Sequence, residues 1–263
     1  MGRFSYMKQV NKLFLLFLAV IIAIFTYAYM AGKDLESKTF TGLSDIKEMM
    51  VLNDNAGSEG DDPLTSVENR IYDKDVNTMK QLYEKRDVIA KVTLKGRSQA
   101  INTMCSQVEV LDIYKGKQNI DDSSIQVYEP FGILYTGDKQ EMLKIFGACL
   151  PMRENEEYIL FLRKEMDGKY NFVSGLYGKY HVDGDAYLKT DGSEPSVEKI
   201  LENDMLDFYM SEEKKAQIDE ELAIGGLDKE AALTELKSYE RLEKLKETRA
   251  NIRSQFSAYG IAS

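Results

Sequence analysis

The chain has 263 residues, of which 43% are hydrophobic and 30% are charged, a composition typical of a folded protein with one sizeable domain or two small ones. The net charge is −10, and because Arg3, Lys8 and Lys12 are the only charged residues before a long apolar run, the remainder carries −13. A surface of this sign repels phosphate backbones, so nucleic acid is not an expected partner.

The apolar run predicts a membrane anchor in residues 1–32. Leu13 to Gly32 contains no charged residue, and at ~1.5 Å per residue it spans roughly 30 Å, the thickness of a bilayer core. The basic residues before it predict a cytoplasmic N-terminus and an extracytoplasmic remainder, with membrane lipid as the partner of the helix. A cleaved signal peptide is the rival interpretation, but the small-residue pattern before a cleavage site is poor.

Residues 33–70 are predicted to be a flexible tether between the anchor and the folded part. Ser44 is a candidate cap for a short helix that ends near Leu52. Residues 53–63 contain no apolar side chain larger than alanine, which is typical of a loop. Such a tether would let the folded domain stand away from the bilayer.

The pattern of residues 71–190 predicts a mainly β domain. A helix over 74–85, capped by Asp73 or Asp75, precedes the first strand. Alternating or continuous apolar runs predict five strands, over 87–94, 105–114, 124–128, 157–162 and 170–173. Residues 138–146 have a capping-box pattern and predict a helix between the third and fourth strands. The dipeptide Asp183-Gly184 predicts a hairpin that joins strands 180–182 and 186–188.

Residues 191–263 predict a helical extension. Pro195 suits the first turn of a helix that reaches Met210. A second helix follows Ser211 and ends at the glycine pair 225–226, and a third runs from Lys229 to about Ser254. One face of the third helix is predicted to cover the β domain through Leu242, Leu245, Ile252 and Phe256. The fold class is therefore α+β.

Five strands with a helix between the third and the fourth match the inventory of an OB-type barrel. The segments 87–92, 108–116, 157–162 and 175–180 resemble uncharacterised surface proteins of Gram-positive bacteria. Those proteins are similar in turn to the netrin module and to tissue inhibitors of metalloproteinases. The resemblance implies a binding module and not an enzyme. The inhibitors use an N-terminal cysteine to ligate zinc, and here the anchor occupies that end, so inhibition by that route is not implied.

Residues able to carry chemistry are few. His181 is the only histidine, and neither a nucleophile motif nor a cysteine lies near it in sequence, so it is interpreted as structural. Asp183, Asp185 and Asp191 lack the spacing of an EF-hand, although a weak irregular calcium site stays open. No catalytic, cofactor-binding or metal-ligating residue is assigned.

Cys105 and Cys149 are the only cysteines. Outside the cytoplasm they are predicted to form a disulfide, which would stabilise the fold by roughly 4 kcal/mol in the chain-entropy model. Two buried free thiols are the alternative. With one histidine in the chain, the pair does not make a zinc site.

These observations favour a membrane-anchored, non-enzymatic ectodomain that binds a protein or a cell-envelope component. Two alternatives stay open. The helices after Pro195 would suit a scaffolding or assembly protein that packs on partner subunits. A cell-envelope hydrolase that uses paired carboxylates is the third hypothesis, which geometry must decide because 44 acidic residues make chance pairs certain.

Overall fold

The computed structural model describes residues 43, 46, 48–52, 76–100, 103–120, 122–135, 141–146, 148–190, 196–208, 215–216, 218–220, 222 and 229–262. The predicted anchor, residues 1–32, lies outside these ranges, as does most of the predicted tether. Within the described part of the chain, no helix is both long and apolar enough to cross a membrane.

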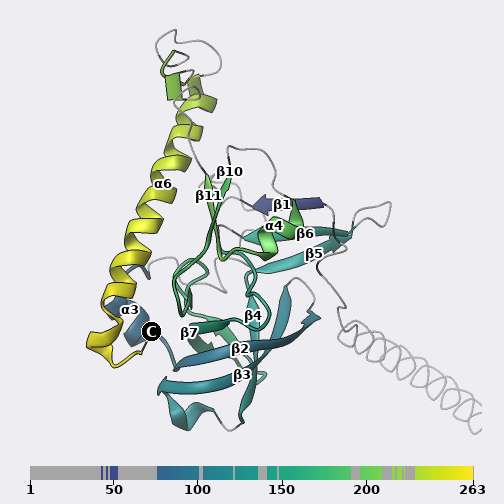
Figure 1. Cartoon of the computed structure of the whole chain (residues 1–263), viewed down its shortest axis with the longest axis vertical. Coiled ribbons are helices and arrows are strands. Elements are labelled where there is room, and N and C mark those ends of the chain that lie inside the picture. The colour runs from purple at the N-terminus through teal and green to yellow at the C-terminus, as the bar shows by residue number, and fades with distance from the viewer. Residues whose placement is uncertain are drawn as a thin grey trace, which may run out of the picture.

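A closed five-stranded β-barrel forms the centre of the molecule (Figure 1). Its strands are β2 (Val88–Gln99), β3 (Met104–Lys115), β4 (Ser124–Glu129), β8 (Tyr170–Phe172) and β7 (Glu157–Lys164), in that spatial order. The sheet closes because β7 also pairs antiparallel with β2. All neighbours are antiparallel except β4 and β8, and β9 (Lys179–His181) extends the sheet along β7. The expected small barrel is confirmed, and each of its five strands lies where a strand was predicted.

Alternating apolar side chains from all five strands fill the barrel. The buried residues of this interior include Val92, Leu94, Val108, Val127, Leu160 and Phe172. β7 is the strand that contacts the most neighbours, because it pairs with β2 on one edge and with β8 and β9 on the other. Its apolar run therefore packs on both faces, as a central strand requires.

Two glycines allow the barrel ends to close. Gly116 ends β3 with φ of +81°, and a Cβ there would lie 1.9 Å from the carbonyl oxygen of Asp87. Gly178 precedes β9, and a Cβ there would lie 2.7 Å from that of Phe172. Both glycines belong to the segments on which the resemblance rests, and both are needed for close backbone approach.

A second, three-stranded sheet replaces the helix predicted over 138–146. β6 (Glu141–Phe146) pairs antiparallel with β5 (Phe131–Tyr135) and parallel with β1 (Glu48–Leu52). The helix prediction was wrong because the spacing of the apolar residues in this segment fits the period of a helix as well as that of a strand. Leu143 and Ile145 alternate into the core, and the two flanking strands satisfy the β6 backbone.

β1 also corrects the predicted helix over 44–52. Residues 48–52 are a strand, and the described residues Leu43 and Ile46 are buried in the same core as β6. This part of the predicted tether therefore belongs to the fold.

The helix predicted over 74–85 begins later than expected. α3 spans Met79–Lys85, and its N-cap is Thr78 and not Asp73 or Asp75. The Thr78 hydroxyl accepts a hydrogen bond from the backbone N–H of Gln81. Met79 and Leu82 bury the inner face of the helix against the barrel. Of the apolar face predicted for this helix, Val76, Met79 and Tyr83, only Met79 and Tyr83 lie in α3, and Val76 is buried just before it.

The predicted hairpin around Asp183-Gly184 does not form. Gly184 has a φ of +111°, but Asp183 does not adopt positive φ, as a type I′ turn requires of both residues. β9 instead pairs with β7, while β10 (Tyr187–Thr190) pairs in parallel with β11 (Met205–Phe208). The chain turns at Gly184 to pass from the barrel to this two-stranded sheet.

The helix predicted from Pro195 to Met210 is divided between a helix and a strand. α4 spans only Val197–Leu201 and is capped by Ser196, and β11 follows it. Met205 and Leu206 are buried as strand residues beside β10. The helical spacing of apolar residues misled the prediction because tertiary pairing with β10 overrides it.

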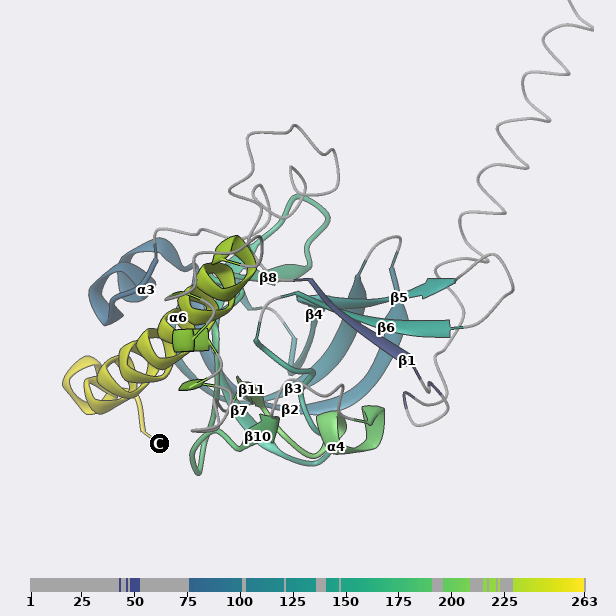
Figure 2. The ribbon, with the colours of Figure 1, turned by 90° about the horizontal axis from the view of Figure 1, so that it is seen from above.

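The last predicted helix is confirmed as α6 (Lys229–Ser254), which runs beside the barrel and ends near α3 (Figures 1 and 2). Of its predicted inner face, Leu245, Ile252 and Phe256 are buried, and the Leu242 side chain lies outside the described part. Ile252 and Phe256 pack against Phe161 and Tyr180. Short 3₁₀ turns complete the described elements, at Lys117–Asn119 and Phe256–Tyr259.

We predict that Ile252→Ala lowers the free energy of unfolding by about 2–4 kcal/mol, because it removes a fully buried side chain between α6 and the barrel. Chemical denaturation of the full chain measures this loss. Glu247→Ala, at an exposed position on the same helix, is the matched control and should change stability by less than about 0.5 kcal/mol. Equal effects of the two substitutions would mean that α6 does not pack as described.

Candidate functional site

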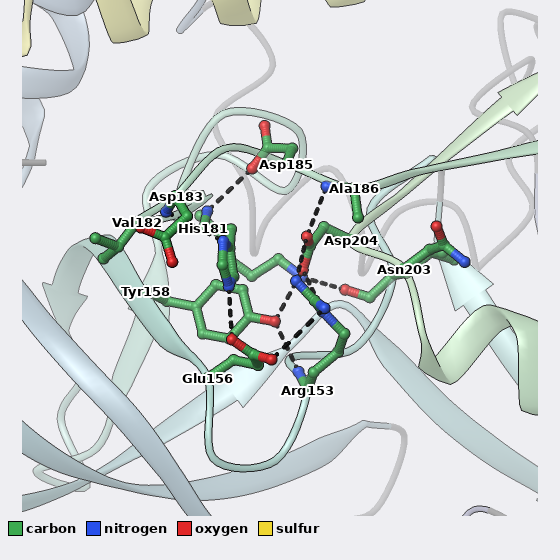
Figure 3. A network of polar contacts seen from close by, with 12 residues as sticks. Arg153, Glu156, Tyr158, His181, Val182, Asp183, Asp185, Ala186, Asn203 and Asp204 are labelled. Atoms are coloured by element: carbon green, nitrogen blue, oxygen red, sulfur yellow. Dashed lines mark hydrogen bonds and ion pairs between the residues drawn. The ribbon is translucent and has the colours of Figure 1, made fainter.

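A cluster of polar side chains lies where α6 passes the end of the barrel (Figure 3). It gathers residues that are far apart in the sequence. Tyr158 comes from β7, His181 from β9, and Asp204 from the residue before β11. Arg249 comes from α6. The cluster is therefore built by the tertiary fold and not by a local motif.

Asp204 is the centre of the cluster and is fully buried. Its carboxylate accepts hydrogen bonds from Arg153 at 3.3 and 3.0 Å, from the Tyr158 hydroxyl at 2.8 Å and from the backbone N–H of Ala186 at 2.8 Å. Burial opposes ionisation of Asp204, but its pKa is held below the ordinary value by four neighbours: the Lys179 ammonium, the Ala186 N–H, the Tyr158 hydroxyl and Arg153. Asp204 is thus a buried anion at neutral pH.

Tyr158 is bound on both sides of its hydroxyl. It donates to Asp204 and accepts from the backbone N–H of Arg153 at 2.8 Å. Burial and the neighbouring Asp204 carboxylate raise its pKa far above the ordinary value. Such a hydroxyl is a fixed donor, and it does not serve as a base or a nucleophile near neutral pH.

His181 is buried, and both of its ring nitrogens have partners. Nδ1 accepts from the backbone N–H of Asp183 at 3.2 Å, so Nε2 carries the proton of the neutral ring and donates to Glu156 at 3.0 Å. The His181 backbone N–H donates to Asp185 at 3.0 Å. The sequence interpretation of a structural histidine agrees with these contacts.

Arg249 and Arg253 attach α6 to this cluster. Arg249 is 1% exposed, donates to Asp185 at 3.0 and 2.7 Å and to the carbonyls of Leu176 and Lys179, and lies over the Tyr180 ring. Burial opposes its charge, but the Asp185 carboxylate raises the pKa of Arg249 above its ordinary value. Arg253 donates to the carbonyls of His181 and Val182.

A second buried carboxylate, Glu129 at the end of β4, ties the barrel to the segment before β7. It accepts from Arg97 at 3.2 Å, from the backbone N–H of Met152 at 2.8 Å and from the Ser106 hydroxyl. Arg97 also donates to the Met152 carbonyl. Sequence reasoning missed Glu129, although its place two residues after Val127 on the inward row of β4 was a usable signal.

In both clusters the polar contacts hold separate segments of the chain together. Asp185, Asp204 and Glu129 each face a guanidinium group, so none is a free carboxylate in an apolar pocket of the kind that acts as a general acid. Among the residues that the structure describes, no group of three His, Cys, Asp or Glu side chains could hold a metal ion. Asp185 is engaged by Arg249, Asp183 is exposed, and Asp191 lies outside the described residues.

Cys105 and Cys149 are both buried and free in this structure, which does not contain the predicted bridge. Cys149 packs in the cluster that includes Met104. Because neighbouring residues of a strand point to opposite faces, Cys105 on β3 faces away from that cluster. Burial raises the pKa of both thiols, which makes them poor nucleophiles. The disulfide stays a prediction, and the geometry favours two thiols in separate environments.

Comparison of the sequence with known protein families and with curated proteins found no match.

We predict that Asp204→Asn lowers the free energy of unfolding by about 3 kcal/mol at pH 7, because it leaves Arg153 and Lys179 without their buried counter-charge. Since folding lowers the Asp204 pKa, its contribution is present above the ordinary value of 3.8 and is lost as the pH falls through the folded pKa. The loss caused by the substitution should therefore shrink below pH 4 in denaturation curves. Asp183→Asn, at an exposed position, is the control. A substitution effect that is independent of pH would contradict the role of the ionised carboxylate.

Proposed function

We propose that this chain is a membrane-anchored extracytoplasmic protein whose β-barrel binds a protein or a cell-envelope component and catalyses no reaction. The observation that carries the non-enzymatic part is the state of the buried carboxylates. Those of Asp204, Asp185 and Glu129 are each saturated by an arginine and by backbone or hydroxyl donors. Groups held in this way position the chain, and they have no free proton-transfer role.

The same observation disfavours a carboxylate-dependent hydrolase. Such an enzyme needs two facing carboxyl groups, one of them with a raised pKa, on either side of a substrate. Asp204 has a lowered pKa and lies against Arg153, with no second carboxylate facing it among its hydrogen-bond partners. Glu156 is partly exposed, but it is engaged by His181 and Arg153.

We further propose that the barrel is of the OB type, as in the surface proteins that the sequence resembles. Its five strands follow a Greek-key path, since the last strand, β8, returns to lie beside the third, β4. The departure from that type is the β5–β6 hairpin, which stands where the helix between the third and fourth strands was expected. OB-type barrels are binding modules in many settings, and this likeness is one of fold-level analogy.

The scaffolding alternative receives less support. It would be favoured by an apolar stripe left exposed on the tail, but Leu245, Ile252 and Phe256 are all buried within the chain. A partner could reach only other parts of the tail.

We predict that protease added to intact cells or spheroplasts digests the barrel and leaves a small membrane-bound N-terminal fragment. The uncharged run between Lys12 and Lys33 and the basic residues before it are the reason. An epitope tag at each end of the full chain reports the outcome on immunoblots, with a cytoplasmic protein as the control for lysis. Protection of the C-terminal tag would contradict the proposed topology, and so would recovery of a free, N-terminally shortened protein in the medium.

Crosslinking in the same cells, followed by identification of the captured molecule, then tests whether the barrel has a stable partner.

A further inference from the structure

One outer face of the barrel carries uncharged polar side chains in register across three strands. Gln107 on β3 lies opposite Gln126 on β4, and Tyr128 on β4 lies opposite Asn171 on β8. The strand neighbours of these residues fill the barrel interior: Val108, Val127, Tyr170 and Phe172. By the alternation of strand side chains, the four residues Gln107, Gln126, Tyr128 and Asn171 therefore face outward. We call them the amide face.

Tyr128 is held in one orientation on this face. Its hydroxyl donates to Asp167 at 2.8 Å and accepts from the Lys169 ammonium at 3.0 Å. Both partners come from the turn between β7 and β8, the Lys169 ammonium lies over the ring at 5.1 Å from its centroid, and Tyr128 as a residue is partly exposed. A ring that is already fixed loses little conformational entropy when a ligand packs on it.

The charged groups around the amide face are paired. Lys169 lies 3.7 Å from Asp167, Arg163 lies 3.4 Å from Glu165, and Lys95 on β2 lies 2.7 Å from Glu109 on β3. This surface is thus locally balanced in a chain whose net charge is −10. It offers a polyanion or a polycation no electrostatic attraction, and it is suited to an uncharged polar ligand.

Asn171 supplies the observation that points to a ligand. Its side chain is only 8% exposed, its Nδ2 donates to Glu165 at 3.0 Å, and its Oδ1 is buried without a donor. A buried acceptor without a partner is costly, and because this oxygen is itself buried, a ligand satisfies it through a bridging water and not by direct contact. Gln107 and Gln126 form the next cross-strand pair along β3 and β4 and are both exposed, and each amide can both donate and accept.

We propose that the amide face binds an uncharged, hydroxyl-rich glycan chain. Sugar hydroxyls both donate and accept, which matches the exposed amides of Gln107 and Gln126. The C–H edge of a sugar ring is apolar and suits the fixed ring of Tyr128. This inference rests on the proposed function, because it names a cell-envelope glycan as the component that the barrel binds.

The test is calorimetric titration of the full-length chain in detergent micelles with chitohexaose in its fully N-acetylated form, a soluble uncharged oligosaccharide. Heparin serves as the polyanionic comparison. Gln126→Ala and Tyr128→Ala should each weaken chitohexaose binding at least tenfold while leaving the melting temperature nearly unchanged. Gln118→Ala removes an exposed amide from the turn after β3, away from the amide face, and should leave the affinity unchanged.

The inference is overturned if chitohexaose does not bind, if only heparin binds, or if Gln126→Ala and Tyr128→Ala bind as the wild type does. A protein captured by crosslinking in cells, together with no chitohexaose binding, would overturn the glycan and leave the proposed function standing. Protection of the barrel from external protease would overturn the proposed function whatever the titration gives.

Discussion

A charge buried in a protein must be paired, and this requirement determines how the tail of the chain attaches to the barrel. Arg249 is almost completely buried, and so is its partner Asp185. An unpaired guanidinium at that depth would be strongly destabilising, so α6 has one position in which its arginine meets the carboxylate and the carbonyls of Leu176 and Lys179. The apolar residues of α6 supply burial, and the arginine specifies the alignment.

The same constraint links the separate small sheets to the barrel. Asp204 precedes β11, yet its partners are Arg153 and Tyr158 from the start of β7 and Ala186 from the start of β10. Glu129 likewise joins β4 to the segment before β7, because its carboxylate accepts from the backbone N–H of Met152. A buried ion pair is not in itself strong evidence for net stability, because two well-packed apolar residues can do as well. Its role here is to select one arrangement of segments that could otherwise slide on an apolar surface.

The contrast between local apolar patterns and long-range pairing explains which elements the sequence could predict and which it could not. The strands of the barrel were predictable because continuous or alternating apolar runs such as 157–162 have one interpretation in a closed sheet. The segments 141–146 and 205–208 were not, because their apolar residues fit a helix as well as a strand, and the choice is made by pairing with β1 and β5 in one case and with β10 in the other. Local propensity is a weak guide where pairing partners are remote.

The polar clusters could not be predicted from the sequence for a related reason. Asp204, Arg153 and Arg249 are separated by about fifty residues each, and among 44 acidic and 34 basic residues no spacing distinguishes these from the exposed ones. His181 was interpreted as structural because no nucleophile accompanied it in sequence, and its partner Glu156 became visible only in the fold. The amide face likewise depends on strand register, which a single sequence does not fix.

A double-mutant cycle on Asp185 and Arg249 tests the central claim most directly. Asp185→Asn, Arg249→Met and the double variant would be compared with the wild type by chemical denaturation of the full chain. If a paired buried charge fixes α6, each single variant loses about 3–5 kcal/mol, and the double variant loses at least about 2 kcal/mol less than the two losses combined. Losses that simply add would contradict the account, since they would mean that the two residues stabilise the protein independently of one another.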